Sequence, residues 1–385
     1  MIRTVAIVAD THADQHSRWD EHCRVMSWIV EDIARRRCDL VVHTGDIYDG
    51  ISTPAERAFV SGWCQAVCEA SPLAVCGGNH EEPGDVGALG KLRTRHPIVA
   101  TERPMVATMA GIAVAFLPWP RKAHLLAAIG QPVDAPTADR LAVECLQSVL
   151  RGLGAGLHKH DGPRVLTAHV MIGGSLTDHD QPIIGTSMEL SVGDLALAAP
   201  DFAALGHIHT AVKNTWRTPI HAAYPGAPYH VNYGEPGPGK GYLIARLDGH
   251  QLVSLERVRT PCTPMLLLAA RYSDGGLTYP GARPDSAMVA GADVRLRYRV
   301  KAAERAAASL VAAEEKARLL AAGAVVVKVE ADPEVVAVMR APTVAAAGST
   351  EEQLLARWDT RGQYDDDERA RLLAKFADVE EAAAQ

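Results

Sequence analysis

Five short polar segments, each at the end of an apolar run, constrain this chain more than any other feature. They are Asp10-Thr-His12, Gly45-Asp46-Ile-Tyr-Asp49, Gly78-Asn79-His80-Glu81, Ala168-His169 and Gly206-His207-Ile-His209. The apolar runs are short and rich in β-branched residues, which predicts strands. Polar residues that follow neighbouring strands mark the edge where α/β sheets bind ligands. We therefore expect the five segments to meet in one site.

The first 255 or so residues alternate predicted strands with helical stretches, which indicates a mixed α/β fold with helices covering sheets. One helix should carry Trp19, Met26 and Ile33 on a buried face, because these residues recur at helical spacing. A second should begin at Thr53-Pro-Ala-Glu56, a capping box with proline in the first turn. The expected strands are Thr4–Ala9, Asp39–His43, Leu73–Cys76, Ile112–Leu117, Arg164–His169 and Phe202–Leu205.

The chain changes character after about Thr260. The alternating run Asp293–Val300, an Ala/Glu-rich helix at Lys301–Ala321 and an apolar run at Ala324–Val329 predict a small β-α-β unit. Three arginines of the first run share one face, which suits either a solvated surface or contact with phosphates. A Pro/Ala/Gly linker at Ala341–Gly348 leads to two short helices. Their expected capping pairs are Ser349 with Glu352 and Asp365 with Glu368.

Composition excludes some classes of protein. The chain has 385 residues, net charge −7 and no apolar run of the ~18 residues that a membrane helix needs. Its N-terminus lacks the apolar core of a signal peptide. Seven cysteines without zinc-site spacing predict reduced thiols and a cytoplasmic protein. Proteins that bind nucleic acids usually carry an excess of basic residues, so the negative net charge argues mildly against such a partner. However, residues 351–385 account for −5 of this charge, and the rest of the chain is nearly neutral, which removes most of the objection.

The side chains of the five segments predict a metal site. Carboxylate and amide oxygens mixed with imidazoles suit Mn²⁺, Fe²⁺ or Zn²⁺ better than Ca²⁺. A carboxylate that bridges two cations holds them ~3.5–4 Å apart, as in enzymes that cleave phosphate esters. Each segment alone is weak, since a histidine after a strand is more often structural. Five such segments in order favour the metal interpretation.

The order of these motifs resembles that of the calcineurin-like metallophosphoesterase superfamily, and in particular the SbcD-type nucleases. Pro54 after the second motif, Tyr224-Pro-Gly-Ala-Pro228 and Lys240-Gly-Tyr242 strengthen the resemblance. It implies a β-sandwich flanked by helices at residues 1–258, the nuclease domain. It further implies a small α+β capping domain at 259–340, and a linker with a helical segment at 341–385.

The resemblance also implies a role for each site residue. One metal would be bound by Asp10, His12 and His209, the other by Asn79, His169 and His207, and Asp46 would bridge them. His80 would lie beside the scissile phosphate as the catalytic residue, and Asp49 would orient a ligand. Glu81 stands where the family usually has aspartate, Asp14 where a small residue is usual, and Ala227 where serine is usual. These departures affect substrate contacts more than metal ligands.

The function implied is a two-metal, manganese-dependent DNA nuclease that acts as a double-strand exonuclease and a single-strand or hairpin endonuclease. Its implied partners are DNA, a second copy of the chain in a homodimer, and an SbcC-like coiled-coil ATPase bound through residues 349–385. The protein would be cytoplasmic and associated with the nucleoid, or it would lie in the host cytoplasm if it is viral. Two alternatives stay open. One is a phosphoesterase acting on small diesters such as cyclic nucleotides, and the other is a DNA-end tether with a vestigial site.

Overall fold

The structure is a computed structural model that describes residues 1–127, 135–176, 188–210, 214–233, 240–334, 349–361 and 364–384. The predicted linker at Ala341–Gly348 lies outside the described residues. The chain divides into two units, Met1–Tyr298 with Ala307–Glu330, and Arg299–Ala306 with Ala331–Gln385. This division does not follow the expected boundaries near residues 258 and 340, which stay predictions.

The first sheet has the strand order β14-β13-β1-β2-β3-β4. Strands β1 to β4 are parallel, whereas β13 and β14 join as an antiparallel hairpin beside β1. The apolar runs that predicted β1, β2 and β3 are all strands, and their ends differ from the prediction by two residues or fewer. Their bounds are β1 Ile2–Val8, β2 Leu40–His43, β3 Leu73–Cys76, β4 Ile98–Thr101, β13 Gly241–Asp248 and β14 Gln251–Arg259.

The second sheet has the strand order β11-β12-β10-β7-β6-β5. Its centre, β6, β7 and β10, is parallel and consists of the three further strands that the sequence predicts. The bounds are β5 Met105–Met109, β6 Ile112–Leu117, β7 Arg164–His169, β10 Phe202–Gly206, β11 Thr215–Trp216 and β12 Ala222–Ala223. A separate short pair consists of β8 Met171–Ile172 and β9 Glu189–Leu190.

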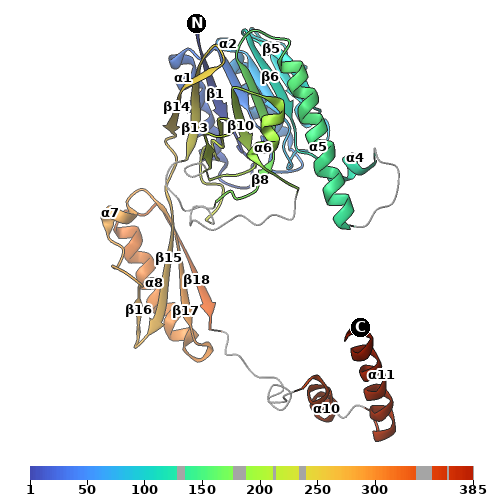
Figure 1. Ribbon diagram of the computed structural model, residues 1–385. Coiled ribbons are helices and arrows are strands. Elements are labelled where there is room, and N and C mark those ends of the chain that lie inside the picture. Colours follow the sequence, from blue (N-terminus) through green and yellow to red (C-terminus); the bar gives the residue numbers. More distant parts are fainter. Residues whose placement is uncertain are drawn as a thin grey trace. The chain divides into compact units, whose positions relative to one another are not determined.

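The two sheets pack face to face and helices cover their outer sides (Figure 1). Ile7, Val42, Phe116 and Phe202 lie in the core between the sheets and have no exposed surface. Helices α1 and α2 cover the first sheet, and α5 covers the second (Figure 1). The predicted sandwich flanked by helices is confirmed.

The helices of the sandwich are α1 Trp19–Arg36, α2 Pro54–Ala70, α3 Asp85–Leu89, α4 Lys122–Ala127, α5 Ala135–Leu157 and α6 Val192–Leu195, and a 3₁₀ turn, η1, spans Ala196–Ala198. The predicted start of α2 is confirmed: the Thr53 hydroxyl accepts from the Glu56 amide, and the Glu56 carboxylate accepts from the Thr53 amide.

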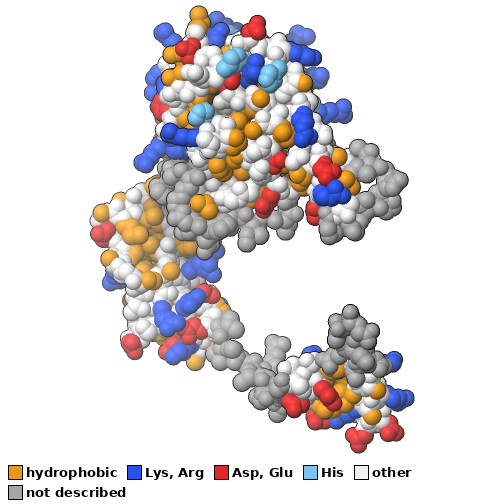
Figure 2. All heavy atoms as spheres, in the orientation of Figure 1, with side chains coloured by type: hydrophobic (Ala, Val, Ile, Leu, Met, Phe, Trp, Pro, Cys, Tyr) orange, Lys and Arg blue, Asp and Glu red, His pale blue; other side chains and the backbone are white. Residues whose placement is uncertain are grey.

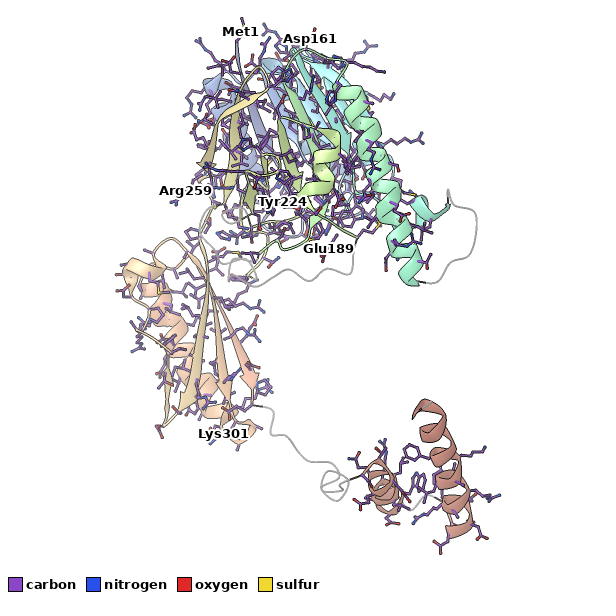
Figure 3. The ribbon with its side chains drawn as sticks, viewed as in Figure 1. Met1, Asp161, Glu189, Tyr224, Arg259 and Lys301 are labelled. Carbon is purple, nitrogen blue, oxygen red and sulfur yellow. The ribbon has the colours of Figure 1, made fainter. Side chains whose placement is uncertain are left out.

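The chain after Arg259 (labelled in Figure 3) forms a four-stranded sheet with the order β16-β15-β17-β18, so the predicted β-α-β unit is wrong in its strand number. The sequence missed β15 because leucine and alanine, which favour helices, dominate it. Helix α8 also begins later than predicted, since Lys301 is extended and a 3₁₀ turn follows it. The bounds are β15 Met265–Ser273, β16 Gly276–Thr278, α7 Ser286–Val289, β17 Asp293–Val300, η2 Ala302–Glu304, α8 Arg305–Ala321 and β18 Val326–Pro333.

Two helices end the chain, α10 Thr350–Arg361 and α11 Asp366–Ala384. Both predicted capping boxes are confirmed, because the amide of Glu352 donates to Ser349 Oγ at 3.1 Å and that of Glu368 to Asp365 Oδ1 at 2.8 Å. Hydrophobic side chains show between charged ones on these helices (Figure 2). Within the described residues, none of the helices is both long and apolar enough to cross a membrane.

Candidate metal centre

The loops after β1 and β2 continue the pairing of their strands beyond the sheet. The amide of Asp10 donates to the Gly45 carbonyl, and the amide of His12 donates to the Asp46 carbonyl, both at 3.0 Å. Two motifs that are about 35 residues apart in sequence are thereby fixed side by side.

Four of the predicted ligands have unusual backbone conformations. Asp10, His12, Asp46 and His207 have positive φ angles of 50°, 42°, 53° and 102°. Such angles are uncommon outside glycine and persist only where the surrounding structure enforces them. They turn the chain sharply at the strand ends, which brings these side chains into the site.

The third motif is anchored on Asp46. The amides of Asn79 and His80 both donate to Asp46 Oδ1, at 2.8 and 3.0 Å. Gly78 permits this approach, because a Cβ atom there would collide with the Asp46 carboxylate. The buried Glu81 carboxylate accepts from the amides of Ile47 and Gly78 and so ties the second motif to the third.

The second sheet supplies the remaining imidazoles. His169 Nε2 lies 3.0 Å from Asn79 Oδ1 and 3.2 Å from Asp46 Oδ2. His207 Nδ1 also lies 3.0 Å from Asn79 Oδ1, and the His207 amide donates to Asp10 Oδ1 at 2.8 Å. His209 Nε2 lies 2.9 Å from His12 Nε2. All seven predicted ligands therefore lie together at one edge of the sandwich.

The accessory motifs brace the loops that carry these histidines. The Tyr224 hydroxyl (residue labelled in Figure 3) donates to the Val170 carbonyl at 2.7 Å, next to His169. Lys240 Nζ donates to the His209 carbonyl at 3.4 Å. Among the described residues these motifs support the site and contribute no ligand atom to the clusters.

The cluster fits a pair of divalent cations. Asp10, His12 and His209 form one group with ligand atoms within 4.8 Å of one another, and Asp46, His169 and His207 form another. Asp10 Oδ2 is buried without a hydrogen-bond partner, which is costly unless a cation or a proton compensates it. The facing nitrogens of His12 and His209 likewise suit a shared cation. A third possible group contains His12, Asp46 and His80.

Charges inside the cluster compensate one another strongly. Burial disfavours the charged form of His169, yet the Asp46 carboxylate outweighs this and raises the pKa of His169 to about 9. Burial would raise the pKa of Asp46, but His169 and His12 hold it well below its usual range. Burial lowers the pKa of His207 to about 4, so this imidazole is neutral and able to bind a metal at pH 7.

His80 differs from the other histidines of the site. Its side chain is 41% exposed, whereas those of His12 and His169 are almost fully buried. Asp49 Oδ1 lies 3.1 Å from His80 Nδ1 and 2.8 Å from His12 Nδ1. The hydrogen bond to Asp49 raises the pKa of His80. Asp49 is therefore placed to orient both imidazoles, and His80 is the partly exposed one of the two.

Sequence reasoning missed the aromatic neighbour of the cluster. The Trp119 ring lies 4.7 Å from the His207 ring and 5.9 Å from the His169 ring, measured between centroids. Pro118-Trp119-Pro120 directly follows the buried strand β6, and this position at a strand end is the feature that could have indicated a residue near the site. Nothing in its residue types indicated a metal site.

The comparisons with known proteins agree with this geometry. Residues 3–141 match the family model for the calcineurin-like phosphoesterase. The SbcD subunit of the nuclease SbcCD from Escherichia coli K12 is 26% identical over 291 residues, which cover 68% of this chain and 69% of that protein. Its counterpart in Escherichia coli O157:H7 matches equally well.

Solved structures give weaker matches. TT1561 of Thermus thermophilus is 14% identical with a TM-score of 0.39, covering 67% of this chain and 100% of the other. A dimetal phosphatase from Danio rerio is 13% identical with a TM-score of 0.38, covering 67% and 97%. These scores are too low to say anything about activity. From the match of residues 3–141 to the calcineurin-like phosphoesterase model and from the assembled cluster, we conclude that this chain is a metal-dependent hydrolase of phosphate esters.

Proposed function

We propose that this chain is an SbcD-like two-metal DNA nuclease, acting as a double-strand exonuclease and as an endonuclease on single strands and hairpins in DNA end processing and repair. The observation that carries the hydrolytic part is the Asp46 carboxylate, which lies against ligands from both sheets. The DNA part is supported by similarity to a nuclease subunit, which extends well beyond the phosphoesterase match.

In this proposal one Mn²⁺ would be held by Asp10, His12 and His209 and the second by Asn79, His169 and His207, and both would share Asp46. The cations, when bound, would neutralise the phosphodiester charge and supply Lewis acidity. The protein contributes the geometry: two backbone amides orient Asp46, and the Nδ1–H of His169 donates a hydrogen bond to the Thr44 carbonyl at 2.9 Å. Such secondary hydrogen bonds fix ring orientation and tautomer.

His80 is the catalytic residue in this proposal. Its exposure allows contact with a substrate, and the Asp49 carboxylate favours the protonated ring. A protonated imidazole beside the scissile bond can donate a proton to the leaving oxygen, which contributes typically about 10²–10⁴ in rate. Asp49 is then a positioning residue that acts through His80 and His12.

The tail is proposed to bind an SbcC-like coiled-coil ATPase. Leu354, Leu355 and Trp358 on α10, like Leu373 and Phe376 on α11, are only half-buried within the chain. Short helices that bury so little are marginal alone and gain stability in a partner's groove. A homodimer and a cytoplasmic, nucleoid-associated location complete the proposal, as the resemblance of the motifs implies.

The test is a nuclease assay with Mn²⁺ on duplexes with defined ends and on hairpins, with and without an SbcC-like ATPase. The purified full chain should release short products from duplex ends and open hairpin loops, while Asp46→Ala should not. Bis-p-nitrophenyl phosphate serves as a parallel small diester. Metal content is measured on the same samples.

Two outcomes would overturn the nuclease proposal. Turnover of the small diester alone, even with the ATPase present, would favour a phosphoesterase of small diesters such as cyclic nucleotides. DNA bridging without any cleavage under Mn²⁺ would favour a DNA-end tether with a vestigial site.

A further inference from the structure

A cavity of about 300 Å³ opens beside the metal cluster. One wall is the loop at Gly77, Gly78 and Glu81, which also carries Asn79 and His80 into the site. Pro118 and Trp119, which follow the end of β6, also line the cavity. The amide of Trp119 donates to the Gly77 carbonyl at 3.0 Å and joins the two segments. We name this space the Trp119 cavity.

Trp119 belongs to both the cluster and the cavity. Its indole is tilted 38° against the His207 ring at 4.7 Å between centroids, and it also lines the cavity. A ligand in contact with this indole would therefore lie one side chain away from a proposed metal ligand. This places the ligand next to a phosphate held at the proposed metal site.

The charges of the cavity suit a neutral, flat ligand with polar edges. Glu102 accepts from the amides of Gly84 and Gly87 at 2.9 and 3.1 Å, so its carboxylate is held by the backbone. Arg121 donates to the Glu81 carbonyl at 3.2 Å. The lining therefore contains both acids and bases, since Glu82 and Arg103 belong to it as well. A bare phosphate would face these carboxylates, whereas a base can accept from the arginines and donate to the acids.

We propose that the Trp119 cavity receives the nucleobase of a nucleotide adjacent to the scissile phosphodiester, with the base stacked on the indole. This inference rests on the proposed nuclease function and adds a substrate contact to it. The volume lies at the lower end of the roughly 300–1,000 Å³ of small-molecule sites. A base enters such a cavity only when it has left the duplex stack. On a duplex end, the nucleotide next to the cleavage position must therefore unpair before cleavage.

The experiment removes the base instead of the protein's side chain. Single-stranded oligonucleotides carry one tetrahydrofuran abasic residue on either side of the main cleavage position, and kcat/KM with Mn²⁺ is compared with that for the intact strand. The wild-type chain should prefer the intact strand at one of the two positions by roughly 5- to 150-fold. This is the fold-change that corresponds to the ~1–3 kcal/mol of base–aromatic stacking.

Variants then assign the effect to the indole. Trp119→Ala should bring the intact-to-abasic ratio close to one, and Trp119→Phe should retain most of it. Trp28→Ala is the matched control, because Trp28 is also partly buried but packs on the core under α1 and α2. It should keep the wild-type ratio. Metal content is measured for each variant to exclude an indirect effect through His207.

The outcomes separate the inference from the function on which it rests. A wild-type ratio near one on both sides would overturn the inference and leave the nuclease intact. The inference would also be overturned if Arg121→Ala lowered kcat/KM equally on intact and abasic strands while Trp119→Ala had no effect. That result would indicate that the cavity binds a phosphate. A wild-type chain that cleaves no DNA would overturn the proposed function itself.

Discussion

Asp46 contacts residues of three other motifs, those that follow β1, β3 and β7. One oxygen accepts two backbone amides, and the other lies 3.2 Å from His169 and 3.7 Å from His12. Its positive φ is uncommon for a non-glycine residue, which indicates that the fold enforces this position. The carboxylate is therefore fixed before any cation binds.

Asp46→Asn tests the bridging role. Asparagine keeps one oxygen for the two amides but loses the negative charge, so metal binding should fail at both positions. Loss of a residue that only hydrogen-bonds to a metal ligand costs about 10–100-fold in metal affinity or activity. Because Asp46 is proposed to bind both metals directly, its substitution should lower cleavage by more than about 100-fold. Metal analysis and the Mn²⁺ nuclease assay provide the measurement. A variant with full two-metal occupancy would contradict the bridging assignment.

His80→Ala separates a catalytic residue from a ligand. The variant should retain both metals and lose about 10²–10⁴ in kcat, because only proton donation is removed. His250→Ala is a close control: His250 is 46% exposed and pairs with Asp201 at 3.1 Å, much as His80 pairs with Asp49. Loss of metal together with activity in His80→Ala would support the third ligand group instead.

Among the helices and strands, the helix starts marked by a capping box were predicted correctly, whereas the start of α8 was not. The capping boxes of α2, α10 and α11 were all predicted, because a cap depends only on residues three positions apart. Strand β15 was missed, because its leucines and alanines form a strand only beside β16 and β17. The arginines of β17 are partly neutralised, since Arg295 pairs with Glu330 and Arg299 with Asp332.

Helix α8 gives a prediction about pH. Buried Glu315 accepts from Arg318, Arg283 and Tyr279, and these contacts outweigh burial and lower its pKa from 4.5 to about 2. A carboxylate whose pKa is lower in the folded state stabilises the fold above pH 4.5 and loses that effect as the pH falls towards 2. The loss amounts to about 3 kcal/mol at most.

Hydrogen exchange of the α8 amides between pH 6 and pH 3 measures this effect. Protection should fall with pH in the wild type, and the fall should be much smaller in Glu315→Gln. Glu314→Gln, at the exposed neighbouring position, is the control and should behave as the wild type does. Equal slopes in Glu315→Gln and the wild type would refute the assignment.

Over the molecule as a whole, the site and the tail are separable. Every residue proposed to bind metal lies between residues 10 and 209, whereas the acidic tail begins after residue 348. Deleting 349–385 should therefore leave metal content and hydrolysis of the small diester unchanged. It should weaken association with an SbcC-like ATPase, measured by pull-down.

A point variant refines the deletion. Leu373→Asp places a charge on the half-buried face of α11, and Ala374→Asp places the same charge at an exposed position. Only the former should weaken ATPase binding. Unchanged binding by both the deletion and Leu373→Asp would count against the tail as the docking segment.

Part of the fold and the ligand types of the site could be predicted from the order of amino acids alone. Short β-branched runs predicted six strands, capping pairs predicted helix starts, and the order of Asp10, Asp46, Asn79, His169 and His207 predicted a metal site. These signals are local, because strand propensity and caps depend on near neighbours in the chain.

How those residues meet follows from the packing of the two sheets. Asn79 Oδ1 lies 3.0 Å from both His169 and His207, Gly78 must lack a side chain, and Trp119 stands between the cluster and a cavity. These contacts join residues that are roughly 30 to 130 positions apart in the chain. Their distances are fixed by the close-packed core between the sheets, which no local pattern encodes.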